Sequence, residues 1–106
     1  NDFREDLGRP DLPFVLGQIG EFLYTRKDPT KTPHARMIND ALSNIPNRVP
    51  NTACWRSTGL THKGDEVHFD TRSEREMGRR YATEMIRLRK QQSKRSFHLH
   101  PGRLGR

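Results

Sequence analysis

Two histidines and three carboxylates stand close together in residues 62–70, which makes this segment the best equipped for chemistry. Within it, Asp65 precedes His68 by three residues. On a tight loop, an aspartate at this spacing can fold back so that its carboxylate accepts the Nδ1 proton of the imidazole. The Nε2 atom is then free to take a proton from a serine, while the carboxylate stabilises the imidazolium that forms. The spacing is therefore compatible with the aspartate and histidine of a catalytic triad.

Other interpretations of residues 62–70 remain open from the residues alone. An Asp-x-x-His pair occurs by chance in many sequences, and His68 could simply bond to a neighbouring carboxylate or cap the next helix. A metal site is a further alternative, because imidazole and carboxylate groups are both common ligands. No recognised zinc-ligand spacing is met, so we expect neither a metal nor a cofactor. The potential ligands are His62, Asp65, His68 and Asp70.

Two apolar segments before this loop are predicted to form strands. Residues 13–20 lie in a short, nearly continuous apolar run bounded by turn residues, which is typical of a strand buried on both faces of a parallel sheet. Residues 52–58 have the β-branched and aromatic bias of a second strand. They lead into a predicted loop over residues 59–64, at the position where α/β folds build their sites.

One helix is predicted between the strands. Thr32 and Pro33 resemble an N-cap followed by proline at the first helical position, which predicts a helix over residues 33–44. Its apolar face would hold Met37, Ile38, Ala41 and Leu42.

A second helix is predicted after the loop. Ser73 and Glu76 form a Ser-x-x-Glu capping box, which predicts that the helix starts near Ser73 and covers residues 73–88. We expect its apolar stripe to pack across the sheet, with Gly78 allowing a close approach. The stripe consists of Met77, Tyr81, Met85 and Leu88, widened by Ala82 and Ile86.

The predicted order of strand, helix, strand, loop and helix indicates an α/β fold with helices packed on a parallel sheet. Two strands cannot bury the apolar stripes of two helices and also shield their own edges. Only 30% of the residues are hydrophobic and 31% are charged, which is lean for a soluble domain. We therefore expect that part of the chain is unpacked or that part of the domain is missing.

The net charge of +7 originates in the C-terminal segment. Residues 87–106 carry seven lysine and arginine side chains and no acid, whereas residues 1–86 hold thirteen basic and thirteen acidic side chains. We predict that residues 91–106 form an irregular, flexible, basic tail. An alternative function is a basic module in which residues 87–106 bind nucleic acid or another polyanion. Phe97 is the only aromatic residue of that segment, so nucleic acid is not the favoured partner.

The single cysteine, Cys54, cannot form an intramolecular disulfide and has no second cysteine at metal-ligand spacing. We interpret it as a small buried hydrophobe rather than a nucleophile. No apolar run approaches the roughly 18 residues of a membrane span, and no positively charged start leads into an apolar signal core. We therefore expect no membrane partner.

The segment around Asp65 and His68 resembles a known protein family. Residues 59–73, continuing into 76–82, resemble the C-terminal signature of the SGNH, or GDSL-type, hydrolases. More narrowly, they resemble the branch that contains the acetylxylan esterases of carbohydrate esterase family six and the sialic-acid-type acetylesterases. Residues 12–22 and 45–53 also resemble that branch, in the expected order.

The resemblance, which covers about residues 8–88, implies a fold and a function. It implies a three-layer α/β/α, flavodoxin-like domain with a five-stranded parallel sheet. It also implies a carbohydrate O-acetylesterase that acts on an acetylated carbohydrate without a cofactor, in which Asp65 and His68 complete the catalytic triad. A secreted or periplasmic location is suggested by the resemblance alone.

The sequence departs from the family pattern at the nucleophile. The family's serine lies in an N-terminal Gly-x-Ser block, and its oxyanion donors lie in two later blocks, all upstream of the matching segments. Ile19 follows Gly17 and Gln18 where a serine would be needed. None of the five serines has the required context, and these are Ser43, Ser57, Ser73, Ser93 and Ser96.

These observations together predict how the chain is organised. Residues 1–90 would be the C-terminal portion of an SGNH esterase domain, followed by the tail over residues 91–106. The partner would be the missing N-terminal half of the same enzyme, which carries the nucleophile. Without a serine and oxyanion donors the histidine has nothing to activate, so the chain alone is expected to be inactive. We also expect Asp65 and His68 to lie within hydrogen-bond reach, with Val67 and Phe69 packing the loop onto the core.

Overall fold

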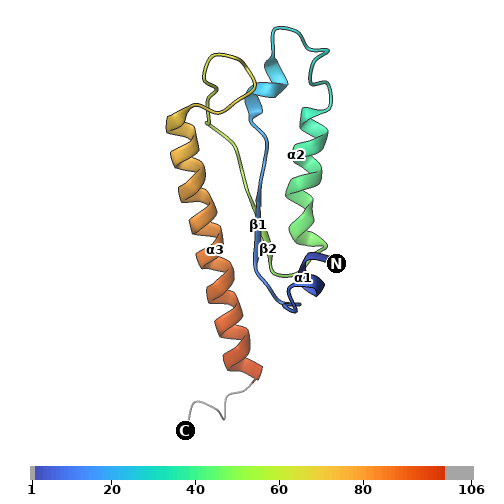
Figure 1. Cartoon of the computed structure of the whole chain (residues 1–106), viewed down its shortest axis with the longest axis vertical. Coiled ribbons are helices and arrows are strands. Elements are labelled where there is room, and N and C mark those ends of the chain that lie inside the picture. The colour runs from blue at the N-terminus through green and yellow to red at the C-terminus, as the bar shows by residue number, and fades with distance from the viewer. Residues whose placement is uncertain (1, 100–106) are drawn as a thin grey trace.

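The computed structural model describes residues 2–99 of the chain and the side chains of residues 3–95. Its two strands lie between two long helices, α2 on one side and α3 on the other (Figure 1). Within residues 2–99, no helix is long and apolar enough to cross a membrane. The elements are, in chain order, α1 (Asp2–Asp6), β1 (Phe14–Gly17), the 3-10 helix η1 (Glu21–Thr25), α2 (Ala35–Asn44), the 3-10 helix η2 (Ile45–Asn47), β2 (Thr52–Trp55) and α3 (Thr71–Leu99).

The predicted parallel pairing of the two strands is confirmed. β1 and β2 run parallel, in a register that places Phe14 beside Thr52 and Gly17 beside Trp55. Each strand has four residues, fewer than residues 13–20 and 52–58 as predicted. The pairing ends because backbone groups beyond the strands bond to side chains instead of to the neighbouring strand. The backbone N–H of Ile19, for example, donates to Asn39 Oδ1. The observed architecture is thus a mixed α/β fold with a two-stranded parallel sheet.

Trp55 forms the centre of the small core. It is 3% exposed, and its indole lies so close to Gly17 that a Cβ atom there would be 2.1 Å from the ring. On α3, the ring of Tyr81 meets the indole edge to face, with 5.2 Å between ring centroids. Leu88, about two turns further along α3, is also buried. The predicted packing of the last helix across the sheet is therefore confirmed.

The predicted helix between the strands is confirmed as α2, but its predicted N-cap and its predicted apolar face are wrong. The helix begins at Ala35 and not at residue 33, and the hydroxyl of Thr32 donates to the carbonyl oxygen of Leu23 at 2.9 Å. Met37 and Ile38 of the predicted apolar face are 66% and 46% exposed. The buried positions of α2 are Ala35 and Asn39, because the Asn39 amide bonds to the backbone at the end of β1.

The predicted capping box of α3 is also wrong. The helix begins at Thr71, two residues before the predicted start, and Asp70 caps it by accepting the backbone N–H of Ser73 at 2.8 Å. The Ser73 hydroxyl is buried and accepts the backbone N–H of Thr61 at 2.8 Å. Glu76 pairs with Arg80, one turn further along the helix. Aspartate and serine are about equally good N-caps, so the choice between them depends on the surrounding loop.

α3 continues well past the predicted end at residue 88. Residues 91–99 are helical, so the expected irregular structure after Lys90 is wrong for them. This segment contains helix-favouring Gln, Lys and Arg and no Gly or Pro. Its side chains reach the body of the chain, since Gln92 donates to the carbonyl oxygen of Asp11 and Arg95 donates to Asn51 Oδ1. The remainder of the predicted tail, residues 100–106, lies outside the described residues.

The surface of α3 that faces the sheet is narrower than predicted. Met77 and Met85 are half-buried, whereas Ala82 and Ile86 are exposed, and Tyr81 is 40% exposed despite its contact with Trp55. Gly78 makes no close approach, because nothing lies within 4 Å of the position that its Cβ would occupy. The close contact between a glycine and the opposing layer occurs at Gly17 on β1.

The two glycines therefore predict opposite effects of the same substitution. Gly17→Ala should lower the free energy of unfolding by about 1–3 kcal/mol, because the new methyl group overlaps the Trp55 ring. Gly78→Ala should raise it by about 1 kcal/mol, because alanine favours an exposed helix interior. Urea denaturation followed by the fluorescence of Trp55, the only tryptophan, measures both. Equal effects of the two substitutions would contradict this account of the core.

Candidate active site

The expected contact between Asp65 and His68 is confirmed. Asp65 Oδ2 lies 2.6 Å from His68 Nδ1, in the loop between β2 and α3. The His68 side chain is 69% exposed and that of Asp65 is 36% exposed. The imidazole is thus held on one edge and open to solvent over most of its surface.

The second oxygen of the Asp65 carboxylate shapes the loop. Asp65 Oδ1 accepts the backbone N–H groups of Val67 and His68, each at 2.9 Å. Aspartate commonly closes tight turns in this way. The backbone N–H of His68, its imidazole and the N–H of Val67 together hold the pKa of the Asp65 carboxyl far below its ordinary value. Asp65 is therefore ionised at neutral pH.

An ionised Asp65 determines which nitrogen of His68 carries the proton. A carboxylate only accepts hydrogen bonds, so the contact at 2.6 Å requires a proton on Nδ1. The neutral imidazole then has its lone pair on Nε2. This arrangement can take a proton from a hydroxyl group placed against Nε2, which is the first act of a general base.

Backbone bonds join the two ends of the loop. The N–H of Lys63 donates to the carbonyl oxygen of His68 at 2.9 Å, and residues 62 and 69 form an antiparallel bridge. Phe69 is half-buried, and its ring lies 5.3 Å from that of Phe22 in η1. The expected packing of the loop through Phe69 is confirmed, whereas Val67 is 39% exposed and does not pack inward. The turn that brings the Val67 N–H to the Asp65 carboxylate points the Val67 side chain toward solvent.

The structure does not bring the four potential metal ligands together. Among the described residues there is no group of three or more His, Cys, Asp or Glu side chains placed to hold a metal ion. His62 Nδ1 instead accepts the backbone N–H groups of Gly64 and Glu66, and Asp70 caps α3. From the sequence, His62 was predicted only as a potential metal ligand, and this role within the loop was not predicted. A polar side chain directly before a Gly-containing turn is a weak signal for such a role.

Three of the described serine hydroxyls have structural partners, and these belong to Ser43, Ser57 and Ser73. Ser57 is fully buried and donates to the carbonyl oxygen of Ile19 at 2.7 Å. Ser43 accepts a hydrogen bond from Gln18 at 2.6 Å, and Ser73 bonds to the loop before α3. Within the described side chains, no serine hydroxyl is hydrogen-bonded to His68. The nucleophile expected by the resemblance is not supplied at this position by those side chains.

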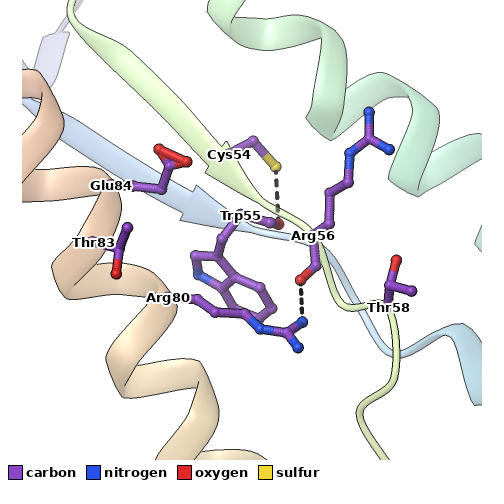
Figure 2. A pocket seen from close by; sticks show the side chains of 7 residues that line it. All are labelled: Cys54, Trp55, Arg56, Thr58, Arg80, Thr83 and Glu84. Carbon is purple, nitrogen blue, oxygen red and sulfur yellow. Dashed lines mark hydrogen bonds between the residues drawn. The ribbon is translucent and has the colours of Figure 1, made fainter.

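A separate hollow of about 450 Å³ lies between β2 and α3 (Figure 2). Arg80 crosses it, donating to the carbonyl oxygen of Arg56 at 2.6 Å and pairing with Glu76 at 3.2 Å. Burial raises the pKa of the Cys54 thiol in its wall, which favours the protonated thiol over the nucleophilic thiolate. The lining contains neither Asp65 nor His68, and consists of Cys54, Trp55, Arg56, Thr58, Arg80, Thr83 and Glu84.

The parallel strands, the helices on either side and the Asp-x-x-His loop are consistent with part of an SGNH-type α/β hydrolase fold. A model of the family described as carbohydrate esterase, sialic acid-specific acetylesterase matches residues 1–87. The chain therefore belongs to this carbohydrate esterase family, as the resemblance indicated. No curated protein matches the chain significantly.

The hydrogen bonds to Asp65 predict an unusually acidic carboxyl group. Its titration, followed by the NMR signal of the side-chain carboxyl carbon, should have a midpoint well below the ordinary 3.8. Because the folded pKa is lower than the unfolded one, the stability that this carboxylate contributes is complete above the unfolded pKa. It is lost as the pH falls from there through the folded pKa.

The variant His68→Ala separates the contributions to this pKa. The substitution removes the imidazole bond, so the pKa of Asp65 should rise. It should stay below the ordinary value, because the backbone N–H groups of residues 67 and 68 still donate. An ordinary titration of Asp65 in the unsubstituted chain would show that this loop geometry does not hold in solution.

Proposed function

We propose that this chain supplies the Asp65–His68 part of the catalytic triad of a carbohydrate O-acetylesterase. The observation that carries the proposal is the contact of 2.6 Å between Asp65 Oδ2 and His68 Nδ1, with the imidazole 69% exposed. Membership of the acetylesterase family supports the reaction class. The substrate is an acetyl ester of a sugar hydroxyl group.

In the proposed reaction, His68 first acts as a base. Nε2 takes the proton of a serine hydroxyl as the serine oxygen attacks the acetyl carbon, and Asp65 stabilises the imidazolium. His68 then gives this proton to the sugar oxygen as the ester bond breaks, which leaves an acetyl group on the serine. A water molecule, deprotonated by His68, attacks the acetyl-serine, and acetate leaves as the proton returns to the serine.

The serine and the oxyanion donors of this reaction lie outside the described residues. The described serines with partners hold the fold together, and the exposed His68 is open to a group from elsewhere. Removal of even one oxyanion donor typically costs about 3–4 kcal/mol of transition-state stabilisation. We therefore place the chain as the C-terminal portion of a three-layer α/β/α domain whose upstream part carries these groups.

Exposed apolar residues support this placement in the larger domain. Phe14 on β1 is 43% exposed, and Met37 and Ile38 on α2 are exposed as well. Parallel strands are usually buried on both faces and paired with further strands. A further strand beside β1 and further packing over α2 would cover these side chains.

The proposal predicts a large loss of activity when the pair is changed in an active form of the esterase that contains this chain. His68→Ala should reduce kcat by roughly 10⁶-fold and Asp65→Asn by roughly 10⁴-fold, because the asparagine favours the wrong tautomer. Hydrolysis of 4-methylumbelliferyl acetate and of an acetylated sugar measures both. His34→Ala changes an exposed histidine at the start of α2 and is the matched control.

The same proposal predicts that the 106-residue chain alone is inactive. It should release no acetate above the buffer rate, and a fluorophosphonate that labels nucleophilic serines should not label it. Adding the upstream part of the domain should restore both hydrolysis and labelling. Full activity of the complete esterase with His68→Ala would disprove the catalytic role.

A further inference from the structure

We propose that His62 is a positioning residue that holds the Asp65–His68 pair in its reactive geometry. Its imidazole does so as a hydrogen-bond acceptor inside the loop, in the tautomer opposite to that of His68. This inference rests on the catalytic role proposed for His68, and it concerns the arrangement of the loop from residue 62 to residue 69.

The first evidence is the pair of hydrogen bonds to His62. Its Nδ1 atom accepts the backbone N–H of Gly64 at 3.0 Å and that of Glu66 at 3.1 Å. These two residues flank Asp65 on either side. A single ring nitrogen therefore determines the path of the backbone immediately before and after the carboxylate.

The backbone at Gly64 and Glu66 has an unusual conformation that the hydrogen bonds to His62 stabilise. Gly64 has φ 113° and Glu66 has φ 64°, and a non-glycine residue with positive φ is energetically unfavourable. Asp65 lies between them and must turn its carboxylate back toward Val67 and His68. The two bonds to His62 hold the strained conformation that makes this return possible.

The second evidence is that the His62 ring is itself anchored. The ring of Phe22 in η1 lies 5.3 Å from the imidazole, with 64° between the ring planes. Phe22 also contacts Phe69 at the other end of the loop. In addition, the backbone N–H of Lys27, just after η1, donates to Glu66 Oε1 at 3.0 Å. His62 thus connects the tip of the loop to η1, outside the loop.

The hydrogen bonds also specify opposite tautomers for the two histidines. A nitrogen that accepts two N–H groups carries no proton, so neutral His62 must have its proton on Nε2. His68 must have its proton on Nδ1 to bond to Asp65. Nε2 of His68 is the proposed base, so the acceptor role of His62 maintains the tautomer on which catalysis depends.

Long-range proton–nitrogen NMR correlations of the imidazole rings test the inference on the 106-residue chain, with both histidines neutral. The expected result is the Nε2–H tautomer for His62 and the Nδ1–H tautomer for His68. A proton on Nδ1 of His62 would overturn the inference without any substitution.

Two substitutions then separate the acceptor from the ring. His62→Phe keeps a ring against Phe22 but removes the acceptor, and His68 should lose its dominant Nδ1–H tautomer. His62→Asn places an amide oxygen near the position of Nδ1, and it should restore that tautomer. An unchanged His68 tautomer in a folded His62→Phe chain would overturn the inference, and so would a failure of His62→Asn to restore it.

Activity of the complete esterase distinguishes this inference from the proposed function. His62→Phe should reduce kcat by roughly 100-fold with little change in KM, and His62→Asn should recover most of the loss. If the His68 tautomer changes as expected while kcat does not, the catalytic role of His68 fails and the positioning role stands. If the tautomer is unchanged while His68→Ala abolishes activity, the positioning role fails and the catalytic role stands.

Discussion

The hydrogen bonds of Asn39 to the backbone of Ile19 are the interaction on which the arrangement of this chain depends. The side chain is 1% exposed, accepts the Ile19 N–H at 2.8 Å and donates to the Ile19 carbonyl oxygen at 2.9 Å. It also donates to the hydroxyl of Tyr24 at 2.7 Å, while Ser57 donates to the same carbonyl from the segment after β2. Buried polar groups that lose such partners cost free energy, so this network fixes where the strands end and where η1 begins. It joins α2, the end of β1, η1 and the segment after β2 at one point.

The position of the Asp65–His68 loop follows from that junction. η1 starts two residues after Ile19, and its Phe22 ring packs against both His62 and Phe69. The loop is therefore supported from outside at two aromatic contacts and from inside by the bonds to His62 and Asp65. The inner bonds set the tautomer of His68, whereas the outer contacts set the place of the loop relative to the sheet. A general base needs both, because its nitrogen must be in the right protonation state and in reach of its substrate.

The sequence was sufficient for features that depend on short-range patterns. The main strands and helices and the Asp65–His68 contact were predicted because they depend on local periodicity or on a spacing of three residues. The parallel pairing was predicted from the order of strand, helix and strand. Features decided by distant partners were not predicted. Asn39 is buried on α2, where an apolar face had been expected. Its partner is the backbone of Ile19, which lies 20 residues earlier, just after β1. Asp70 was overlooked as the cap of α3 because Ser73 is an equally suitable residue type, and only the contact with Thr61 assigns the serine elsewhere.

This difference between short-range and long-range features also explains why the Asp65–His68 part of the proposed triad can be arranged within this chain. The aspartate and histidine lie three residues apart, and their contact requires only a turn that the loop itself stabilises. In the proposed reaction, a serine and its oxyanion donors would instead be brought to His68 Nε2 from other parts of the domain, which requires tertiary packing. Phe14, Met37 and Ile38 remain exposed where such packing would occur. The geometry of His68, the base of the proposed reaction, is thus determined by residues of its own loop. The position of the proposed serine would instead depend on packing of the larger domain against the exposed imidazole and apolar surfaces.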